Sequence, residues 1–123
     1  MCLSRCLSCR RYTGAPVVTL AGYRREQVAW TADPRKIYRS SPDVERGFCG
    51  NCGTPLTWEG DGGEHGPLIE ILISTTDDPA ALVPQFHIHN DERIEWFDIA
   101  DGLPHFHVWG DDGSEPYRHG PAI

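Results

Sequence analysis

The chain has 123 residues, 39% hydrophobic and 24% charged, which predicts a folded globular protein rather than a disordered chain. Its net charge of −7 argues against the basic face that nucleic-acid binding needs, and no run reaches the roughly 18 apolar residues of a membrane span. No secretory signal is recognisable at the first residues, so we expect a cytoplasmic protein whose paired cysteines are metal ligands or catalytic groups rather than disulfides.

The length predicts a single domain over residues 1–123, with 111–123 as a C-terminal tail. The 13 glycines and 10 prolines favour short strands joined by turns over long helices. Turn residues separate apolar segments along the chain, which predicts strands over 16–23, 27–30, 35–40, 44–49, 54–59, 67–75 and 85–89.

The most apolar of these segments, 67–75, is expected to be a central strand. A loop is expected at 60–66, and one helical turn capped by Asp77 or Asp78 over 77–82. A turn at 90–92 precedes the segment 93–99. No segment longer than about ten residues has convincing helical periodicity, so the sequence predicts a mainly β fold.

Two C-x-x-C motifs stand out: CLSC, with Cys6 and Cys9, and CGNCG, with Cys49 and Cys52. A glycine after the second cysteine is typical of a zinc-binding turn, and two pairs supply the four thiolates of a tetrahedral site. A redox pair would need a βαβ context that is missing here, although buried apolar cysteines are also common. Cys2 is left over, either as a spare thiol at a frayed terminus or as a ligand.

Three runs, CLSCRRYTGAP (6–16), YRSSPDVERGFCGNCGTPLTW (38–58) and PQFHIHNDERIEWFDIADGLPHF (84–106), resemble the glutathione-dependent formaldehyde-activating enzyme family, which also includes centromere protein V. The resemblance covers roughly residues 4–106, and RGFCGNCGTPLTW is its most specific part. It implies a β-tent fold of antiparallel sheets pinned by cysteine-bound zinc. It also implies carbon–sulfur lyase activity, the condensation of formaldehyde with glutathione to S-(hydroxymethyl)glutathione.

Members of the family usually carry a structural zinc, held by an N-terminal C-x-C with the later C-x-x-C, and a catalytic zinc held by C-x-C-x-x-C. Cys49 and Cys52 match the later pair, and Cys6 and Cys9 match the last two cysteines of the catalytic motif. The first catalytic cysteine falls on Ser4, a poor zinc ligand beside thiolates, and no upstream C-x-C is present.

The simplest resulting hypothesis is one merged zinc site made by Cys6, Cys9, Cys49 and Cys52. The alternatives are a Cys2–Cys6–Cys9 site and a natural protein that begins further upstream. A three-cysteine zinc leaves a fourth position for a glutathione thiolate, whereas a four-cysteine zinc is closed. The merged site would therefore give the fold without the usual metal chemistry.

Arg10 and Arg11 are predicted to bind substrate, because glutathione carries two carboxylates and guanidinium groups bind carboxylates bidentately. The alternative is surface charge balanced by Asp43 or Glu45. The resemblance adds His87, which has an equivalent in the closing motif of the family, as a candidate donor in the ligand pocket.

The histidines of HIH, His87 and His89, are expected on one strand face, and those of HFH, His105 and His107, repeat the pattern. Such pairs could bind a metal or an anion, but half-exposed residues on a polar sheet face are the simpler interpretation. Further residues received ordinary structural interpretations: Trp58 and Trp96 in the core or a pocket wall, and solvated turn carboxylates at Asp77, Asp78, Asp111 and Asp112.

Two functions remain open at this point. The first is a zinc-binding carbon–sulfur lyase of the formaldehyde-activating type with one zinc per chain, in which the incomplete cysteine set puts catalysis in question. The second is a non-catalytic, zinc-stabilised module that binds a thiol or a partner protein. A redox protein is the third interpretation. Glutathione or another small thiol is the expected partner, with no nucleic acid and no membrane, and a homodimer is plausible.

Overall fold

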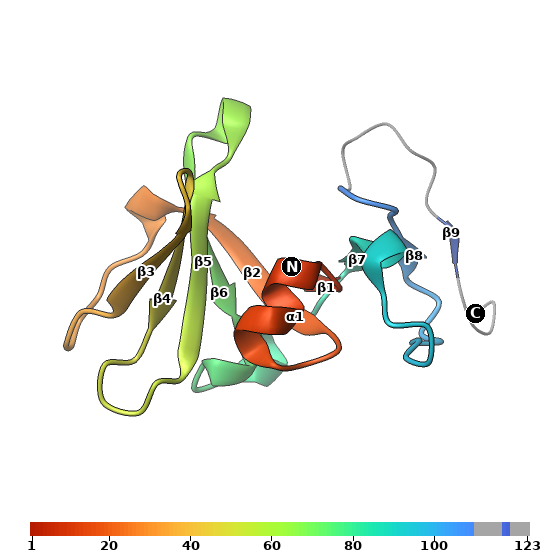
Figure 1. The fold of residues 1–123 in the computed structure, drawn as a ribbon, viewed down its shortest axis with the longest axis horizontal. Helices are drawn as coiled ribbons and strands as arrows, with labels where there is room; N and C mark the ends of the chain where they lie inside the picture. The colour runs from red at the N-terminus through yellow and green to blue at the C-terminus, as the bar shows by residue number, and fades with distance from the viewer. Residues whose placement is uncertain (110–116, 119–123) are drawn as a thin grey trace. The chain divides into compact units, whose positions relative to one another are not determined.

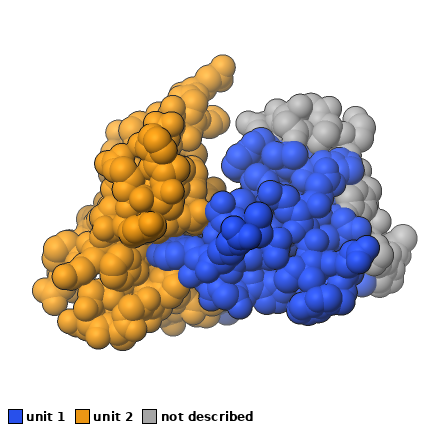
Figure 2. Space-filling model, viewed as in Figure 1, with its two compact units in different colours: residues 1–20, 80–123 blue, residues 21–79 orange. Residues whose placement is uncertain are grey.

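The computed structural model describes residues 1–109 and 117–118, and it is mainly β, as the sequence predicts. The chain forms two compact units, Met1–Leu20 with Ala80–Ile123, here unit 1, and Ala21–Pro79, here unit 2 (Figure 2). No helix among the described residues is long and apolar enough to cross a membrane. Of the predicted tail, 117–118 form a strand and the remainder, with Asp111 and Asp112, lies outside the described residues.

Unit 2 is an antiparallel meander of four strands, β3 (Lys36–Ser41), β4 (Val44–Phe48), β5 (Pro55–Asp61) and β6 (Pro67–Leu72) (Figure 1). The last residues of β2 (Val18–Arg24) also belong to this unit, and β2 neighbours β6 in the strand order. The apolar strand β6 is therefore an interior strand, as expected from its composition. Its residues Ile69 and Leu72 are buried.

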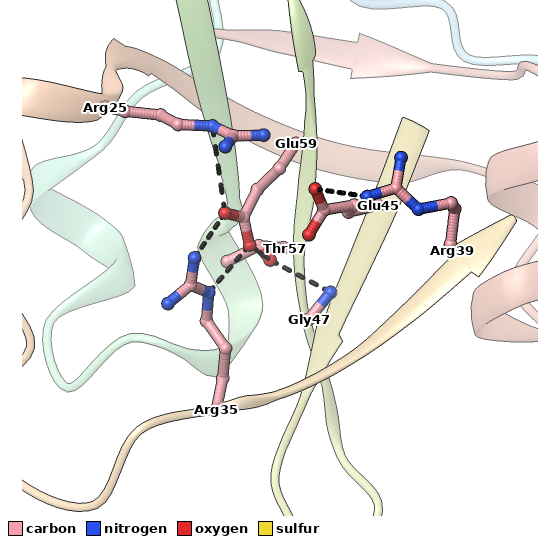
Figure 3. Close-up of polar contacts among 7 residues, drawn as sticks. All are labelled: Arg25, Arg35, Arg39, Glu45, Gly47, Thr57 and Glu59. Carbon is pink, nitrogen blue, oxygen red and sulfur yellow. Dashed lines mark hydrogen bonds and ion pairs between the residues drawn. The ribbon is translucent and has the colours of Figure 1, made fainter. Parts of the chain in front are cut away.

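A buried carboxylate organises the polar interior of unit 2 (Figure 3). The side chain of Glu59 is only 1% exposed, and Arg35 binds it in a bidentate pair in which Arg35 Nε lies 2.7 Å from Glu59 Oε2. The Thr57 hydroxyl donates to the same Oε2 atom at 2.7 Å and accepts from the Gly47 N–H at 3.1 Å. Burial alone would raise the pKa of Glu59, but the hydrogen bonds from Arg35 and Thr57 hold it below its ordinary value.

The site of Gly47 shows how tightly this network is packed. A Cβ atom added at Gly47 would lie 2.3 Å from the Thr57 hydroxyl oxygen, so only glycine allows the close approach of β4 to β5 at this register pair. Thr57 and Glu59 are two residues apart on one strand and so share a face, whereas Trp58 lies on the other. The alternation in TPLTWE therefore places two polar side chains inside unit 2.

Unit 1 contains β1 (Cys2–Ser4) and β7 (Phe86–Ile88), which pair in parallel, and β1 also pairs with the start of β2 in antiparallel orientation. β7 also pairs in parallel with β8 (Pro104–His105), and β8 pairs in antiparallel orientation with β9 (Tyr117–Arg118). Unit 1 thus joins the first residues of the chain to segments more than 80 residues later. Its buried apolar residues are Cys2, Cys9, Val18, Leu20 and Ile88.

The first C-x-x-C motif begins the only α-helix among the described residues, α1 (Leu7–Thr13). The Arg10 N–H donates to the Cys6 carbonyl at 2.9 Å, and Gly14 ends the helix in the left-handed conformation, with φ of 72° and its N–H on the Arg10 carbonyl. The sequence did not predict this helix, because seven residues are too few to show a helical period.

The other sequence predictions hold with shifted ends, except one. The predicted strand 27–30 is wrong, because residues 25–27 form a short 3₁₀ helix, η1 (Arg25–Gln27), and no strand follows before Lys36. The Gln27 side chain accepts from the Arg24 N–H at 2.9 Å and so closes a turn. Trp30, although apolar, lies beside the Arg35 guanidinium, whose carbon is 4.6 Å from the ring centroid.

Four further short 3₁₀ helices follow β5 along the chain. They are η2 (Gly63–His65), η3 (Ile73–Thr75), η4 (Pro79–Ala81) and η5 (Asn90–Glu92). The predicted loop at 60–66 begins later than expected, because β5 extends to Asp61, and the predicted strand 67–75 ends at Leu72. η4 is the helical turn expected within 77–82, and η5 coincides with the predicted turn at 90–92.

Candidate functional site

The first cysteine pair is built around α1. Cys6 immediately precedes the helix and is half-buried, whereas Cys9 lies one turn later and is buried. A hydrogen bond from the Cys9 thiol, assisted by the backbone N–H groups of Cys9 and Ser8, lowers the pKa of Cys6 to about 5, although burial opposes this shift. Cys6 is therefore present as a thiolate at neutral pH, which is the form that binds metals.

Two further side chains meet this thiolate. Ligand atoms of Cys6, His89 and Glu92 all lie within 4.8 Å of one another, and His89 Nδ1 is 3.4 Å from Glu92 Oε2. His89 follows β7, and Glu92 ends η5, so a single turn supplies both. The arrangement offers a sulfur, a nitrogen and an oxygen donor to one point.

Ser4 occupies the place of the expected third cysteine, where it contacts the backbone of Cys6. Its side chain is 1% exposed in β1, and its hydroxyl accepts a hydrogen bond from the Cys6 N–H at 3.3 Å. Cys2 lies two residues earlier on the same strand face and is 6% exposed. The prediction of a frayed terminus around Cys2 is therefore wrong, because β1 is paired on both sides.

His87 belongs to a second cluster, in which Arg5, His87 and His105 are buried and Asp101 is half-buried. Arg5, whose side chain is buried, lies with its NH1 atom 2.6 Å from His87 Nδ1, and Asp101 Oδ2 lies 2.7 Å from His87 Nε2. A guanidinium group only donates hydrogen bonds, so Nδ1 accepts and the ring proton resides on Nε2, which donates to Asp101. Burial lowers the pKa of His87 against the opposing effect of Asp101, so the ring is neutral.

His105 stacks on His87, with ring centroids 3.8 Å apart, because the two residues are register partners on parallel strands. The ligand atoms of His87, Asp101 and His105 also lie within 4.8 Å of one another. This cluster does not fit a metal ion. Both nitrogens of His87 are occupied by hydrogen bonds, and the charge of Arg5 opposes a second cation.

The histidine predictions need two corrections. His87 and His105 are 0% exposed, so they are not half-exposed residues of a polar face. His89 and His107 do not share the faces of their partners, since β7 ends at Ile88 and β8 at His105. His89 adopts the left-handed conformation with φ of 51°, which takes it out of the strand and toward Cys6.

The second cysteine pair forms a tight turn in unit 2. The Gly53 N–H donates to the Cys49 carbonyl at 2.8 Å, and Gly53 has a φ of 77° that glycine tolerates best. Hydrogen bonding to Thr54 and to Cys49 lowers the pKa of the exposed Cys52. The CGNCG motif thus forms a tight turn closed by backbone hydrogen bonds, and zinc binding by this pair remains a prediction. The two pairs belong to different units, and the merged four-cysteine site remains a prediction.

A groove of about 460 Å³ borders α1 in unit 1. Its lining residues are Leu7, Arg10, Arg11, Gly14, Ala15, Pro16, Ile94 and Trp96. Arg10 donates to the Glu92 carbonyl at 2.9 Å and to the Arg5 carbonyl at 3.2 Å, so its guanidinium holds α1 against η5. Arg11 is exposed. Trp96, 76% exposed, is a groove residue and not a core residue.

The groove touches the Cys6 group directly. The Leu7 N–H lies 3.4 Å from Glu92 Oε2, and Leu7 and Arg10, which both line the groove, each contact Glu92. Of the residues predicted to bind substrate, Arg10 contacts Glu92 and Arg11 lines the same groove, while His87 is buried beside Asp101. Glu45, proposed as a partner for these arginines, pairs instead with Arg39.

Sequence reasoning considered His89 as a metal donor only together with His87, and it did not consider Glu92 as a donor or Arg5 and Asp101 as partners of His87. Asp101 was within reach, since the closing motif of the resemblance includes it. Glu92 and His89 carry no signal of their own, because a turn brings them to Cys6, which lies more than 80 residues earlier in the chain.

Zinc, which the resemblance implies, can be compared with this donor set. Among the described residues, the sulfur atoms of Cys2, Cys6 and Cys9 do not form a group whose ligand atoms all lie within 4.8 Å of one another. A single metal ion does fit the donors that are present, since Cys6, His89 and Glu92 offer thiolate, imidazole and carboxylate ligands of the kinds that zinc accepts. The hard–soft mixture is also common in catalytic zinc sites.

The family model described as glutathione-dependent formaldehyde-activating enzyme matches residues 1–92. That range includes both cysteine pairs, His89 and Glu92. No curated protein matches the chain. Because the match covers well over half of the sequence, the chain belongs to the glutathione-dependent formaldehyde-activating enzyme family.

Proposed function

We propose that this protein catalyses the reversible addition of glutathione, or a similar small thiol, to formaldehyde at the Cys6 group of unit 1. The observation that carries the proposal is that two features of unit 1 are in contact. One is the thiolate of Cys6 with His89 and Glu92 beside it. The other is the groove that Arg10 and Arg11 line, in which Leu7 and Arg10 contact Glu92. Family membership points to the same formaldehyde–glutathione chemistry.

The reaction is an addition without redox change. The sulfur of the thiol forms a bond with the carbonyl carbon of formaldehyde, the π electrons of the C=O bond move to oxygen, and that oxygen takes up a proton. The thiol releases one proton, so the product is the hydroxymethyl thioether and the balance closes. Zinc bound at the site would stabilise the attacking thiolate and polarise the carbonyl oxygen.

The residues of the groove bind and orient the thiol. Arg11 is exposed and can form a bidentate pair with one carboxylate of glutathione. Arg10 donates two hydrogen bonds to backbone carbonyls and thereby fixes the turn that carries Glu92. Its positive charge also attracts the anionic peptide. Ile94 and Trp96 provide an apolar wall on which the peptide backbone can rest.

His87 enters the proposal as a positioning residue. It is 0% exposed and both its nitrogens are hydrogen-bonded, which does not favour direct contact with a substrate. Its ring lies on β7, two residues before His89, and its bonds to Arg5 and Asp101 fix the strand from which His89 emerges.

The direct test is exchange spectroscopy by NMR at equilibrium, with ¹³C-formaldehyde, glutathione and zinc-loaded protein. The protein is expected to accelerate the exchange between free formaldehyde and its glutathione adduct, and Cys6→Ser to abolish the acceleration. Arg11→Gln should raise the glutathione concentration at half-saturation roughly tenfold, as expected for one lost charge-assisted pair of about 1.4 kcal/mol. Arg24→Gln, which removes an exposed arginine of unit 2, serves as the control.

An exchange rate with the zinc-loaded protein equal to that of buffer with zinc would contradict the proposal. The second candidate function, a non-catalytic zinc-stabilised module, is favoured by Ser4, which leaves the cysteine set of the catalytic motif incomplete. That module would bind zinc and gain thermal stability with no change in the exchange rate.

A homodimer belongs to the same set of proposals. Every residue of β3 is exposed, and β3 is the first strand of the sheet order, so its edge is available for pairing with a second copy. Sedimentation equilibrium tests this: a dimer weakened by Ile37→Lys on β3 supports it, and a monomer over the whole concentration range contradicts it.

A further inference from the structure

We propose that Cys6, His89 and Glu92 are the three protein ligands of one divalent metal ion, with the fourth position open to solvent or to a substrate thiol. These are the residues that would bind zinc at the site of the proposed function. The assignment rests on that function only for the identity of the group in the fourth position. Metal binding tests the ligands independently of turnover.

The distances suit a tetrahedral ion after small side-chain movements. Bonds of about 2.0–2.3 Å place neighbouring ligands of zinc roughly 3.3–3.8 Å apart. His89 Nδ1 and Glu92 Oε2 already lie at 3.4 Å, and the Cys6 sulfur lies within 4.8 Å of both donors. The Glu92 side chain is exposed and that of Cys6 is half-buried, so both have room to rotate toward a shared ion.

The charges also balance. When they bind a metal ion, a cysteine and a glutamate each bring one negative charge and a histidine brings none, so this ligand set matches the charge of a divalent cation. The guanidinium of Arg10, which contacts this turn, donates to the carbonyls of Arg5 and Glu92. The buried cluster around His87 lacks this balance, because Arg5 brings a positive charge into it.

Backbone and side-chain contacts fix the positions of the three donors. His89 is the only non-glycine residue with positive φ among those described, and its carbonyl accepts from the Glu92 N–H at 3.0 Å, which fixes the turn between them. The Trp109 ring packs edge-on against the imidazole, with centroids 4.4 Å apart. On the other side, the hydroxyl of Ser4 holds the Cys6 N–H.

The hydrogen bonds made to Glu92 resemble those that orient ligands in metal sites. Glu92 Oε2 receives the Leu7 N–H at 3.4 Å, so the carboxylate is oriented from the helix that follows Cys6. The backbone of Glu92 is in turn fixed by Arg10. Such outer hydrogen bonds set ligand direction and affinity. The mixed set also replaces the thiolate that Ser4 cannot supply, and it leaves the open position that a closed four-cysteine site lacks.

Titration of the full-length protein with Co²⁺ alone tests the assignment. A d–d spectrum of tetrahedral type is expected, with His89→Gln and Glu92→Gln each raising the dissociation constant at least about tenfold. The matched controls are His107→Gln and Asp91→Asn. These residues form a nearby histidine–carboxylate pair at 2.7 Å that is not part of the Cys6 group, so both controls should bind as the wild type does.

The double variant Cys49→Ser/Cys52→Ser separates this site from the merged one. It should retain one Co²⁺ with the same affinity for the Cys6 group. Loss of that ion in the double variant, or unchanged binding in both His89→Gln and Glu92→Gln, would overturn the assignment.

A measurement on the wild type guards against variants that do not fold. In long-range ¹H–¹⁵N spectra, Zn²⁺ should shift one ring nitrogen of His89 and leave His65, an exposed histidine of unit 2, unchanged. Ring nitrogens of His89 that keep their shifts at saturating Zn²⁺ would contradict the proposal.

Discussion

Nδ1 of His89 lies 3.4 Å from Oε2 of Glu92, across the single 3₁₀ turn that follows β7. The left-handed conformation of His89 makes this approach possible. In a strand conformation, the His89 ring would lie on the same face of the sheet as the His87 ring. The turn places a nitrogen and an oxygen donor beside the thiolate of Cys6. The metal site and the proposed chemistry both depend on this relationship.

Replacement of Ser4 tests how the site is positioned. Ser4→Ala removes the acceptor of the Cys6 N–H while keeping β1 buried, so we expect metal affinity to fall about tenfold, in the range found for outer hydrogen bonds of metal sites. Ser8→Ala is the control, since the side chain of Ser8 is exposed on α1. Competition with a fluorescent chelator measures both. Equal affinities for Ser4→Ala and Ser8→Ala would show that Ser4 does not position Cys6.

The buried carboxylate of unit 2 predicts a large difference between two similar substitutions. Glu59→Gln leaves Arg35 without its anionic partner in a largely buried position, and we expect the free energy of unfolding to fall by about 2–3 kcal/mol. Glu45→Gln breaks only the exposed pair with Arg39 and should cost less than about 1 kcal/mol. Denaturant unfolding compares the two, and equal losses would contradict the structural role of Glu59.

The same carboxylate predicts a pH dependence with a definite sign. The folded pKa of Glu59 lies below its ordinary value of 4.5, so between these two pH values the unfolded chain binds more protons. Its contribution is complete above about pH 4.5 and is lost as the pH falls through the folded pKa. Unfolding measured from pH 6 to pH 3 should therefore give a shallower loss of stability for Glu59→Gln than for the wild type. Parallel curves would contradict the shifted pKa.

The tautomer of His87 is a further prediction. Arg5 donates to Nδ1, so long-range ¹H–¹⁵N spectra should show the proton on Nε2 at neutral pH, and Asp101→Asn should keep it there because an amide oxygen also accepts. Arg5→Met should change the ring signals and lower stability, because Nδ1 loses its buried donor. A proton on Nδ1 in the wild type would contradict the arrangement of the cluster.

The strands were predictable where composition and turn residues agree. The apolar segment of β6 and the alternation of β4 lie close to their predicted bounds, since both follow from side-chain periodicity. The strand predicted for QVAW is not formed, and its Trp30 is 39% exposed beside the Arg35 guanidinium, so the apolar residues of this segment do not indicate burial in a sheet. The short helix after Cys6 was missed because seven residues give too weak a periodic signal.

The site was half predictable. Cys6, Cys9, Arg10 and Arg11 follow from motifs, and the structure brings all four onto or next to α1. The grouping of His89 and Glu92 with Cys6 was not predicted, because it depends on a parallel pairing of β1 with β7 across more than 80 residues. No local pattern encodes such a pairing. The burial of His87 and His105 follows from the same long-range pairing.

X-ray absorption at the zinc edge of the full-length Cys49→Ser/Cys52→Ser variant tests the central claim most directly, because the variant leaves the Cys6 group as the cysteine-containing site. The account predicts one bound zinc whose first shell contains nitrogen and oxygen scatterers, including imidazole, together with sulfur. A first shell of sulfur alone, or a protein that binds no zinc, would contradict it.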